Sequence, residues 1–414
     1  MGLSQGLSLK VEFLRSISDI KKSDWDSLQK NEYPFLKYDF LSCLEINKCV
    51  SPEKGWYPFH AVITENETLI GLMPIYLKTN SQGEFVFDWS WADAYYRNGL
   101  DYYPKIINSI PFTPATGPRI LCKEVSQKGK IIEAVARKIQ DLSLSSNFSS
   151  FHVLLPNLKE LKHYMDLGFS IRTSNSYHWF NNDYESFEDF LNELTSRQRK
   201  NIRKEREKVS SQNIKTYRLI GREIKKEEWE DFYKLYQTTY YRRGMEGYLN
   251  LDFFLDIANK IPDNIMMVTA RDLEGRLIAS ALNFFDDRVL YGRYWGTSES
   301  YDSLHFEVCY YQGIEFCIEN SLERFDPGVQ GQHKIKRGFL PIETYSAHLI
   351  HDNRFKLAID NFLEEEREHI RSFNDQCKEQ LPFKKENMQS IYSKKVVYAL
   401  LEDSSQKGNP VFCR

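Results

Sequence analysis

The segment FDPGVQGQHKIKRGFLP, from Phe325 to Pro341, gathers the residue types that proton transfer and anion binding require. It carries three glycines, a histidine, two lysines and an arginine in one short run. An imidazole exchanges protons near neutral pH, lysine and arginine bind phosphate or carboxylate, and glycine lets the backbone approach a ligand. We therefore expect Lys334 and Arg337 to hold an anionic substrate beside His333, a titrating group. A solvated basic turn is the alternative interpretation.

A second group of candidates begins a predicted helix at Leu304, in the run LHFEVCYYQGIEFCIENSL. Ser303 stands directly before it and is a favoured N-cap residue, and the free N–H groups of a helix start attract anions. In its first turn, Glu307 is predicted to be the general base that deprotonates an attacking ammonium, with His305 as a relay or orienting donor. The alternative is that Glu307 only complements the helix dipole. The site hypothesis requires Glu307 and His333 to face one cavity.

Neighbouring strands supply further candidates. The strand LYGRYWG is predicted to shape the same cleft with Arg293 and Trp295, and Tyr345 is a candidate acid toward the leaving group. Asp88 and Asp93 lie in the ring-rich run FDWSWADAYYRNGLDYYPK, where carboxylates and aromatic faces together suit an amine acceptor. Tyrosine-rich packing under a loop explains this run equally well.

The run TSRQRKNIRKEREKV, residues 195–209, predicts a helix with Arg199 and Arg203 aligned on one face. These side chains are candidates for binding the phosphate of a nucleotide, CoA or tRNA. A solvated charged face is the alternative. Glu205 and Glu207 dilute the positive charge, so the helix does not by itself indicate a general nucleic-acid binder.

Composition excludes several classes. The 414 residues are 41% hydrophobic and 14% aromatic with a net charge of -3, which predicts a globular protein without general affinity for DNA or membranes. Seven scattered cysteines without a C-x-x-C pair predict reduced thiols in the cytoplasm. No apolar run reaches the roughly 20 residues that span a bilayer. The pair His348 and His351 lacks a third ligand nearby, so we expect neither a metal nor a bound cofactor.

A repeated order of elements must position these residues. Three β-rich runs occur in Phe59–Trp91 and again in Ile265–Gly296, each followed by a helix, a strand, a turn and a closing strand. The repetition predicts an internal duplication. The first unit is predicted at 1–190 with a Tyr/Pro-rich insertion at 92–122. The second, 191–372, opens with the basic helix, and 373–414 form a C-terminal extension.

This order is that of the GNAT acyltransferase fold, and two such units in tandem resemble the Fem-type aminoacyl transferases. The strings VFDWSWADAYYRNGLDYYPK, RQRKNIRKER, LHFEVCYYQGIEFCI and GQHKIKRGFLPIETYSAH are similar to those of one bacterial family. That family is the Fem-like group of predicted GNAT N-acyltransferases formerly labelled peptidoglycan biosynthesis proteins. The chain departs from the family pattern at Gln332, where an acidic residue is expected, and at RRGMEGYL, where a Trp-containing turn is expected.

The resemblance implies an α/β (α+β) protein with a tandem duplicated GNAT fold, in which mixed sheets are flanked by helices. It implies direct transfer of an acyl or aminoacyl group to a small-molecule or peptide amine, with no covalent enzyme intermediate. Acyl-CoA and aminoacyl-tRNA both remain open as the co-substrate, so tRNA is a candidate partner. The alternatives are an aminoacyl-tRNA-dependent Fem-type peptide transferase of cell-wall precursors and a non-catalytic peptide or glycan binding module. No oligomeric state follows from the sequence.

Overall fold

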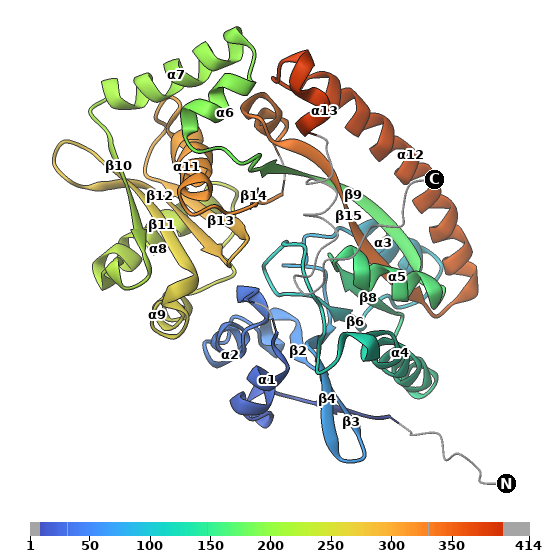
Figure 1. The fold of residues 1–414 in the computed structure, drawn as a ribbon. Helices are drawn as coiled ribbons and strands as arrows, with labels where there is room; N and C mark the ends of the chain where they lie inside the picture. The colour runs from blue at the N-terminus through green and yellow to red at the C-terminus, as the bar shows by residue number, and fades with distance from the viewer. Residues whose placement is uncertain (1–8, 31, 147, 330, 392–414) are drawn as a thin grey trace.

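The computed structural model describes residues 9–30, 32–146, 148–329 and 331–391, and it shows two α/β units joined by a shared sheet (Figure 1). The helices and strands of the first unit are β1 (Lys10–Leu14), α1 (Lys22–Leu28), α2 (Tyr38–Ile46), β2 (Trp56–Pro58), β3 (His60–Glu65), β4 (Thr68–Met73), β5 (Ile75–Lys78), α3 (Trp89–Arg97), β6 (Lys105–Asn108), β7 (Leu121–Cys122), α4 (Lys128–Ser145), β8 (Ser150–Leu154), α5 (Leu158–Asp166) and β9 (Ser170–Phe180).

The second unit repeats the order from β10 onward. Its elements are α6 (Phe187–Glu193), α7 (Ser196–Ser211), β10 (Lys215–Ile220), α8 (Lys226–Tyr241), α9 (Leu251–Lys260), β11 (Ile265–Arg271), β12 (Leu277–Phe285), β13 (Val289–Thr297), α10 (Leu304–Phe306), the π-helical turn η7 (Glu307–Tyr311), α11 (Gln312–Glu319), β14 (Arg324–Asp326), the 3-10 turn η8 (Gln332–Arg337), β15 (Leu340–Ile350), α12 (Asn353–Glu379) and α13 (Met388–Ile391). The predicted duplication and the mixed α/β class are both confirmed.

The closing strands of the two units are exchanged. The large sheet has the order β10-β11-β12-β13-β14-β9-β15-β8-β6-β5-β2, and β1-β3-β4-β7 form a smaller sheet. β9 ends the first unit in sequence, yet it pairs with β14 of the second unit, and β15 pairs with β8 of the first. β9 and β15 pair with each other from Leu340 to His348. In Figure 1 this ribbon joins the two halves, with α12 alongside it. The halves cut at residue 190 would therefore each lack a strand.

A hydrophobic core also crosses the boundary between the units. Trp25, Phe35 and Phe40, from the α1–α2 region, are fully or almost fully buried in one cluster with Phe253 and Phe284 of the second unit. Rings of Phe35 and Phe284 lie 5.2 Å apart, edge to face. Burial of large aromatic side chains is a major source of folding free energy. The second sheet is thus fixed partly by helices from the first half of the chain.

Two predicted boundaries differ from the structure. The stretch EFVFDWSW, expected to be a strand, is a loop followed by α3, because Glu84 and Asp88 turn inward to form ion pairs with Lys105. The third strand of the first unit is instead formed by β6 and β7, inside the predicted insertion at 92–122. The predicted extension at 373–414 starts within α12, which packs on β9 and β15. Residues 392–414 lie outside the described residues.

Candidate functional site

A pocket of about 340 Å³ opens where two strands of the second unit separate. β13 and β14 pair in parallel at three positions, ending at Tyr291 and Asp326. The lining residues beyond this point come from β12, β13, the helix that starts with α10, the turn after β14 and the loop after α8. They are Arg243, Ala281, Leu282, Asn283, Gly292, Arg293, Tyr294, Trp295, His305, Cys309, Tyr310, Pro327, Val329, Gly331, His333 and Lys334.

A β-bulge places Arg293 at this pocket. Leu282 pairs with Tyr294 but Asn283 pairs with Gly292, so Arg293 is the extra residue on β13. Bulges re-aim side chains and are frequent beside active sites. The Arg293 side chain is only 1% exposed and its Nη2 lies 3.0 Å from Asp326 Oδ2. Nε has no hydrogen-bond partner among the described residues, and Nη2 contacts Asp326 without a well-aligned hydrogen bond, so this guanidinium has donor capacity left at the pocket.

The lining is cationic. It includes Arg243, Arg293 and Lys334 together with two histidines, and none of the described residues that line it is Asp or Glu. Lys334 is 2% exposed, and its Nζ donates to Gly328 O at 2.5 Å. Burial lowers the pKa of Lys334 to about 8, against the opposing effect of Asp326. The pocket therefore favours a ligand group that carries, or develops, negative charge.

Both predicted histidines face the pocket. Burial lowers the pKa of His305 to about 4, with further lowering from His333, Lys334 and Arg337. The pKa of His333 is also lowered, first by burial and then by Arg337. The Nε2 of His333 lies 2.8 Å from the hydroxyl of Tyr310, and the ring of His305 meets those of Tyr310 and His333 at 5.2 and 5.7 Å. Both imidazoles are neutral at pH 7 and can accept a proton.

Glu307 does not share this pocket with His333. Its side chain is buried against α7, where Arg206 Nε and Nη2 each donate to one of its oxygens at 3.0 Å. Gln312 Nε2 donates to the same carboxylate at 2.7 Å. The predicted common cavity is not formed, because in the π-helical turn that begins at Glu307 this side chain points toward α7 while His305 and Tyr310 point toward the pocket. The contacts of Glu307 tie two helices together.

Arg337 and Tyr345 also lie outside the lining of the pocket. Arg337 Nη2 donates to Glu205 at 2.6 Å and Nη1 donates to the backbone oxygen of His333 at 2.7 Å. Arg337 therefore supports the turn that carries His333. Tyr345 donates to Glu343 at 2.7 Å on β15. Trp295, by contrast, lines the pocket as predicted, with its ring 5.1 Å from that of His305.

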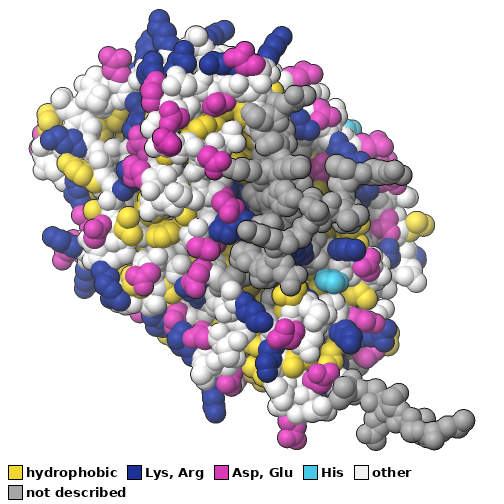
Figure 2. All heavy atoms as spheres, in the orientation of Figure 1, with side chains coloured by type: hydrophobic (Ala, Val, Ile, Leu, Met, Phe, Trp, Pro, Cys, Tyr) yellow, Lys and Arg dark blue, Asp and Glu magenta, His cyan; other side chains and the backbone are white. Residues whose placement is uncertain are grey.

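The basic helix is confirmed as α7. Its Arg206 turns inward to Glu307 and Glu315, but the two predicted arginines do not. Arg203 is an exposed partner of Glu188, and Arg199 donates to Asn192 at 3.3 Å. Figure 2 shows Lys and Arg side chains gathered at the top of the view, over α7. An anion-binding role for Arg199 and Arg203 stays a prediction.

The two aspartates of the aromatic segment have different surroundings. Asp93 is exposed and pairs with Arg97 one turn later in α3. Asp88 is buried: its carboxylate accepts from Ser81 and Tyr102 and lies 2.5 Å from Lys105 Nζ. Burial alone would raise the pKa of Asp88, but the positive charge of Lys105 and the hydrogen bonds from Lys105 and Ser81 hold it far below its usual value. A role in binding an amine stays a prediction for Asp93 and has little room at Asp88.

Sequence reasoning missed four residues that the structure brings to the pocket or directly beside it: Tyr310, Arg243, Asp326 and His178. Tyr310 reads as a core residue in an aromatic helix. Asp326 stands in a short strand that itself gave no chemical signal. His178 belongs to β9, and only the strand exchange brings it to β14. The one available signal was RRGMEGYL, which departs from the family pattern and contains Arg243.

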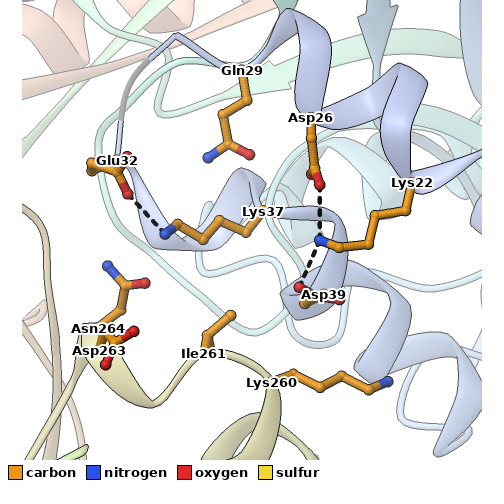
Figure 3. Close-up of a pocket in the computed structure, with 10 residues that line it drawn as sticks. All are labelled: Lys22, Asp26, Gln29, Glu32, Lys37, Asp39, Lys260, Ile261, Asp263 and Asn264. Carbon is orange, nitrogen blue, oxygen red and sulfur yellow. Dashed lines mark hydrogen bonds and ion pairs between the residues drawn. The ribbon is translucent and has the colours of Figure 1, made fainter.

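A second pocket, of about 300 Å³, lies between α1, α2 and α9, where the two halves meet (Figure 3). Its lining mixes both charges. Lys22 is paired with Asp26 and Asp39, and Lys37 with Glu32. No helix within the described ranges is long and apolar enough to cross a bilayer. Nor do three His, Cys, Asp or Glu side chains in those ranges group as a metal site would require.

Comparison with known proteins agrees with the fold. The C-terminal domain of a proposed lysylphosphatidylglycerol synthetase from Agrobacterium fabrum has a TM-score of 0.51 at 8% identity, covering 84% of this chain and 97% of that one. The crystal structure of FemX has a TM-score of 0.49 at 11% sequence identity, and the match covers 82% of this chain and 98% of that one. A tandem GNAT protein from the clavulanic acid biosynthesis pathway has a TM-score of 0.44 at 8% sequence identity, and the match covers 83% of this chain and 99% of that one. No curated protein matches significantly.

The FemAB-like family model, described as peptidoglycan biosynthesis/recognition, matches residues 16–385. This range includes every residue of the pocket and all of both units except β1 and the end of the chain from residue 386. The chain therefore belongs to the FemAB-like family, which is described by peptidoglycan biosynthesis or recognition.

Proposed function

We propose that the chain is an N-acyltransferase whose second unit moves an acyl or aminoacyl group from an activated donor to an amine. The observation that supports this most strongly is the pocket at the separation of β13 and β14, with Lys334 and Arg293 at its side and no described carboxylate in its lining. Acyl transfer passes through a tetrahedral oxyanion, and buried cations already in place stabilise such charge far better than water does.

The first unit suggests which part of a donor would fit. There, loop 109–120 interrupts the strand at the place where β13 has its bulge. Gly117 of this loop donates to Leu155 O at 3.2 Å and accepts from Asn157 N at 3.0 Å, beyond the end of β8. An amide of the chain thus fills the gap between separating strands. The open gap of the second unit suits a donor arm that carries amide groups, which favours an acyl-CoA.

In the proposed reaction, the amine nitrogen attacks the acyl carbon, and the carbonyl electrons move onto oxygen beside Lys334 and Arg293. Collapse breaks the C–S bond of a thioester, or the C–O bond of an ester, as the C–N bond is completed. His333 takes the proton from the amine and returns it to the leaving sulfur or oxygen. Its Nε2 is held by Tyr310, while Nδ1 makes no hydrogen bond to a described residue. This assignment replaces Glu307 as the base.

The pH dependence of transfer follows from the two groups. His333 must be neutral, so the rate rises with pH through its pKa, which lies below 6.5. Lys334 must be charged, so the rate falls as this side chain loses its proton near pH 8. We expect a bell-shaped profile for kcat/KM with its maximum between these values.

The test begins with native mass spectrometry of protein purified from its source, which reveals a co-purifying CoA thioester or tRNA. The donor found is then offered with amino acids and short peptides as amine acceptors. We expect Lys334→Gln to lower transfer by about 10²–10³-fold. The matched control is Lys336→Gln, an exposed lysine of the same turn, which should retain the wild-type rate. Unchanged transfer by Lys334→Gln would overturn the proposal, and a protein that binds no donor would support a binding module.

A specific observation keeps the tRNA-dependent alternative open. The exposed face of α7 presents Arg197, Lys200 and Lys204, for which no ion pair is found among the described residues. α7 packs against η7 and η8, which carry Tyr310, His333 and Lys334. A tRNA acceptor stem laid along this helix would reach the pocket from one side. Loss of tRNA binding in a Lys200→Glu/Lys204→Glu variant, with CoA binding absent throughout, would favour this route.

A further inference from the structure

The carboxylate of Asp326 is the meeting point of several groups beside the pocket. Asp326 is the last residue of β14 and is 2% exposed. Its Oδ2 lies 3.0 Å from Arg293 Nη2, and its Oδ1 accepts a hydrogen bond from Gly328 N at 2.9 Å. The backbone oxygen of Gly328 in turn accepts from Lys334 Nζ. One buried carboxylate is thereby connected to both cations that face the proposed oxyanion.

The exchanged strand closes this arrangement from the other side. His178 on β9 is buried, and its Nε2 lies 3.6 Å from Asp326 Oδ1. Burial lowers the pKa of His178 to about 3, so the ring is neutral and adds no charge. The centre then holds Arg293 and Lys334 beside one carboxylate, and the buried Arg324 also lies within electrostatic range of Asp326. The positive charge therefore exceeds what Asp326 balances.

The first unit offers an internal comparison, because its sheet has the same register. Asn108 pairs with Val153 at the end of the parallel β6–β8 pair, as Tyr291 pairs with Asp326. Val153 pairs in turn with Ala347 of the exchanged strand β15. The positions that correspond to Asp326 and His178 are therefore Val153 and Ala347, both 0% exposed. The unit whose gap is filled by its own loop has apolar residues where the unit with the open pocket has a carboxylate and an imidazole.

We propose that Asp326 is the positioning residue of the pocket: it holds Arg293 directly and Lys334 through the turn at Gly328. This inference deepens the proposed function and takes its catalytic meaning from it. It predicts a measurable property of Lys334 that needs no substrate, so it can fail while the proposed function stands, and the reverse also holds.

Lys334 responds to charges from each element packed around it. Burial lowers its pKa most, Asp326 of β14 and Cys309 of η7 raise it, and Arg293 of β13 lowers it. His305 of α10, His333 of η8 and His178 of β9 also lie within electrostatic range of Lys334. Removing the charge of Asp326 should therefore lower the pKa of Lys334, and removing the charge of Arg293 should raise it.

The experiment is a pH titration of the full chain labelled with ¹³C at lysine Cε and followed by NMR. The Lys334 signal is assigned by its absence from Lys334→Arg. We expect a wild-type midpoint near pH 8. Asp326→Asn keeps the shape of the side chain and its hydrogen-bond acceptor, and should lower the midpoint by about one pH unit. Arg293→Gln should move it the other way by a similar amount.

The opposite signs separate positioning from general damage to the fold. Glu160→Gln is the matched control, because Glu160 is also fully buried and bound to a lysine, Lys128 at 3.1 Å, in the first unit. This change should leave the Lys334 midpoint where it is. Should Asp326→Asn fail to fold, Arg293→Gln alone still decides. Midpoints that stay at the wild-type value in either folded variant, or that move equally in Glu160→Gln, would overturn the proposal.

Discussion

The two units separate a parallel pair of strands at corresponding places and then treat the gap in opposite ways. In the first unit, loop 109–120 lies against the segment after β8, and Arg119 of this loop donates to Leu154 O at 2.7 Å. In the second unit the same gap is a pocket with Lys334 and Arg293 at its side. Duplication thus produced one gap that is filled and one that is open. In the proposed function, this difference assigns the reaction to the second unit and the scaffold to the first.

The charges of the two units differ in the same sense. The first unit buries Lys105 with Glu84 and Asp88, at 2.7 and 2.5 Å, and all three side chains are at most 4% exposed. Lys78 is also buried and lies within electrostatic range of the same two carboxyl groups, so two lysines face two carboxyl groups in this cluster. The second unit has Arg293, Lys334 and the nearby buried Arg324 around one carboxylate, Asp326. A balanced set of buried charges suits a structure that must hold itself together, and a surplus of cation suits one that must hold an anion.

The largest effect is expected from removing the central cation of the buried cluster formed by Lys105, Glu84 and Asp88, here called the sealed cluster. Lys105→Gln leaves Glu84 and Asp88 buried without their cation, which should cost about 3–5 kcal/mol of the free energy of unfolding. Denaturant unfolding followed by circular dichroism measures it, with exposed Lys130→Gln as the control. A loss below about 1 kcal/mol would remove the distinction between a structural cluster in the first unit and a functional one in the second.

The loop that fills the first gap is the next to be tested. Arg119 is 1% exposed and donates to the backbone oxygens of Leu154, Ala115 and Pro118. Arg119→Met keeps much of the volume but leaves these acceptors without a donor, so we expect a loss of about 1–3 kcal/mol. The Lys334 titration should be unchanged in this variant. A shifted Lys334 midpoint would show that the two gaps are not independent.

The comparison also shows what the sequence can and cannot predict. The repeated order of strands and helices, the basic helix, and the positions of His305, His333, Lys334, Arg293 and Trp295 near one another followed from local patterns and from the resemblance. The position of Glu307 was predicted wrongly, because a π-helical turn changes which side chains of a helix share a face. No local sequence pattern indicated that turn.

The role of Asp326 was beyond sequence reasoning for a different reason. Its contact with His178 joins residues that lie on strands from different halves of the chain. Only the exchange of β9 and β15 creates that contact, and strand exchange leaves no periodic signal in either strand. The strand predicted for the start of the aromatic run FDWSWADAYYRNG was wrong for the converse reason. Its strong local preference for a strand was overridden by the ion pairs of Glu84 and Asp88 with the distant Lys105.

A smaller effect is expected from the titration of the sealed cluster. Burial raises the pKa of Glu84 to about 7, above its ordinary value of 4.5. The folded state therefore binds more protons than the unfolded state between these two values, and stability falls as pH rises through this window. Glu84→Gln should remove that slope, a difference of about 1 kcal/mol between pH 5 and 7 once the coupling to Lys105 is considered. If the free energy of unfolding changes by the same amount between pH 5 and 7 in the wild type and in Glu84→Gln, the raised pKa is wrongly assigned to Glu84.

The smallest effect on stability is expected on α7, and it sharpens the question of the donor. Arg203 and Glu188 form a pair in which both side chains are more than half exposed. Arg203→Ala should therefore change the free energy of unfolding by less than about 1 kcal/mol. Its effect on binding depends on the donor. A CoA thioester held in the pocket should bind the variant as it binds the wild type, whereas a tRNA laid along α7 loses a phosphate contact, and its affinity should fall with a weaker dependence on salt. Filter binding of aminoacylated tRNA at two salt concentrations and calorimetry with acyl-CoA separate these outcomes. The variant is expected to be about as stable as the wild type, so a change in affinity reports the donor contact and not a loss of folded protein.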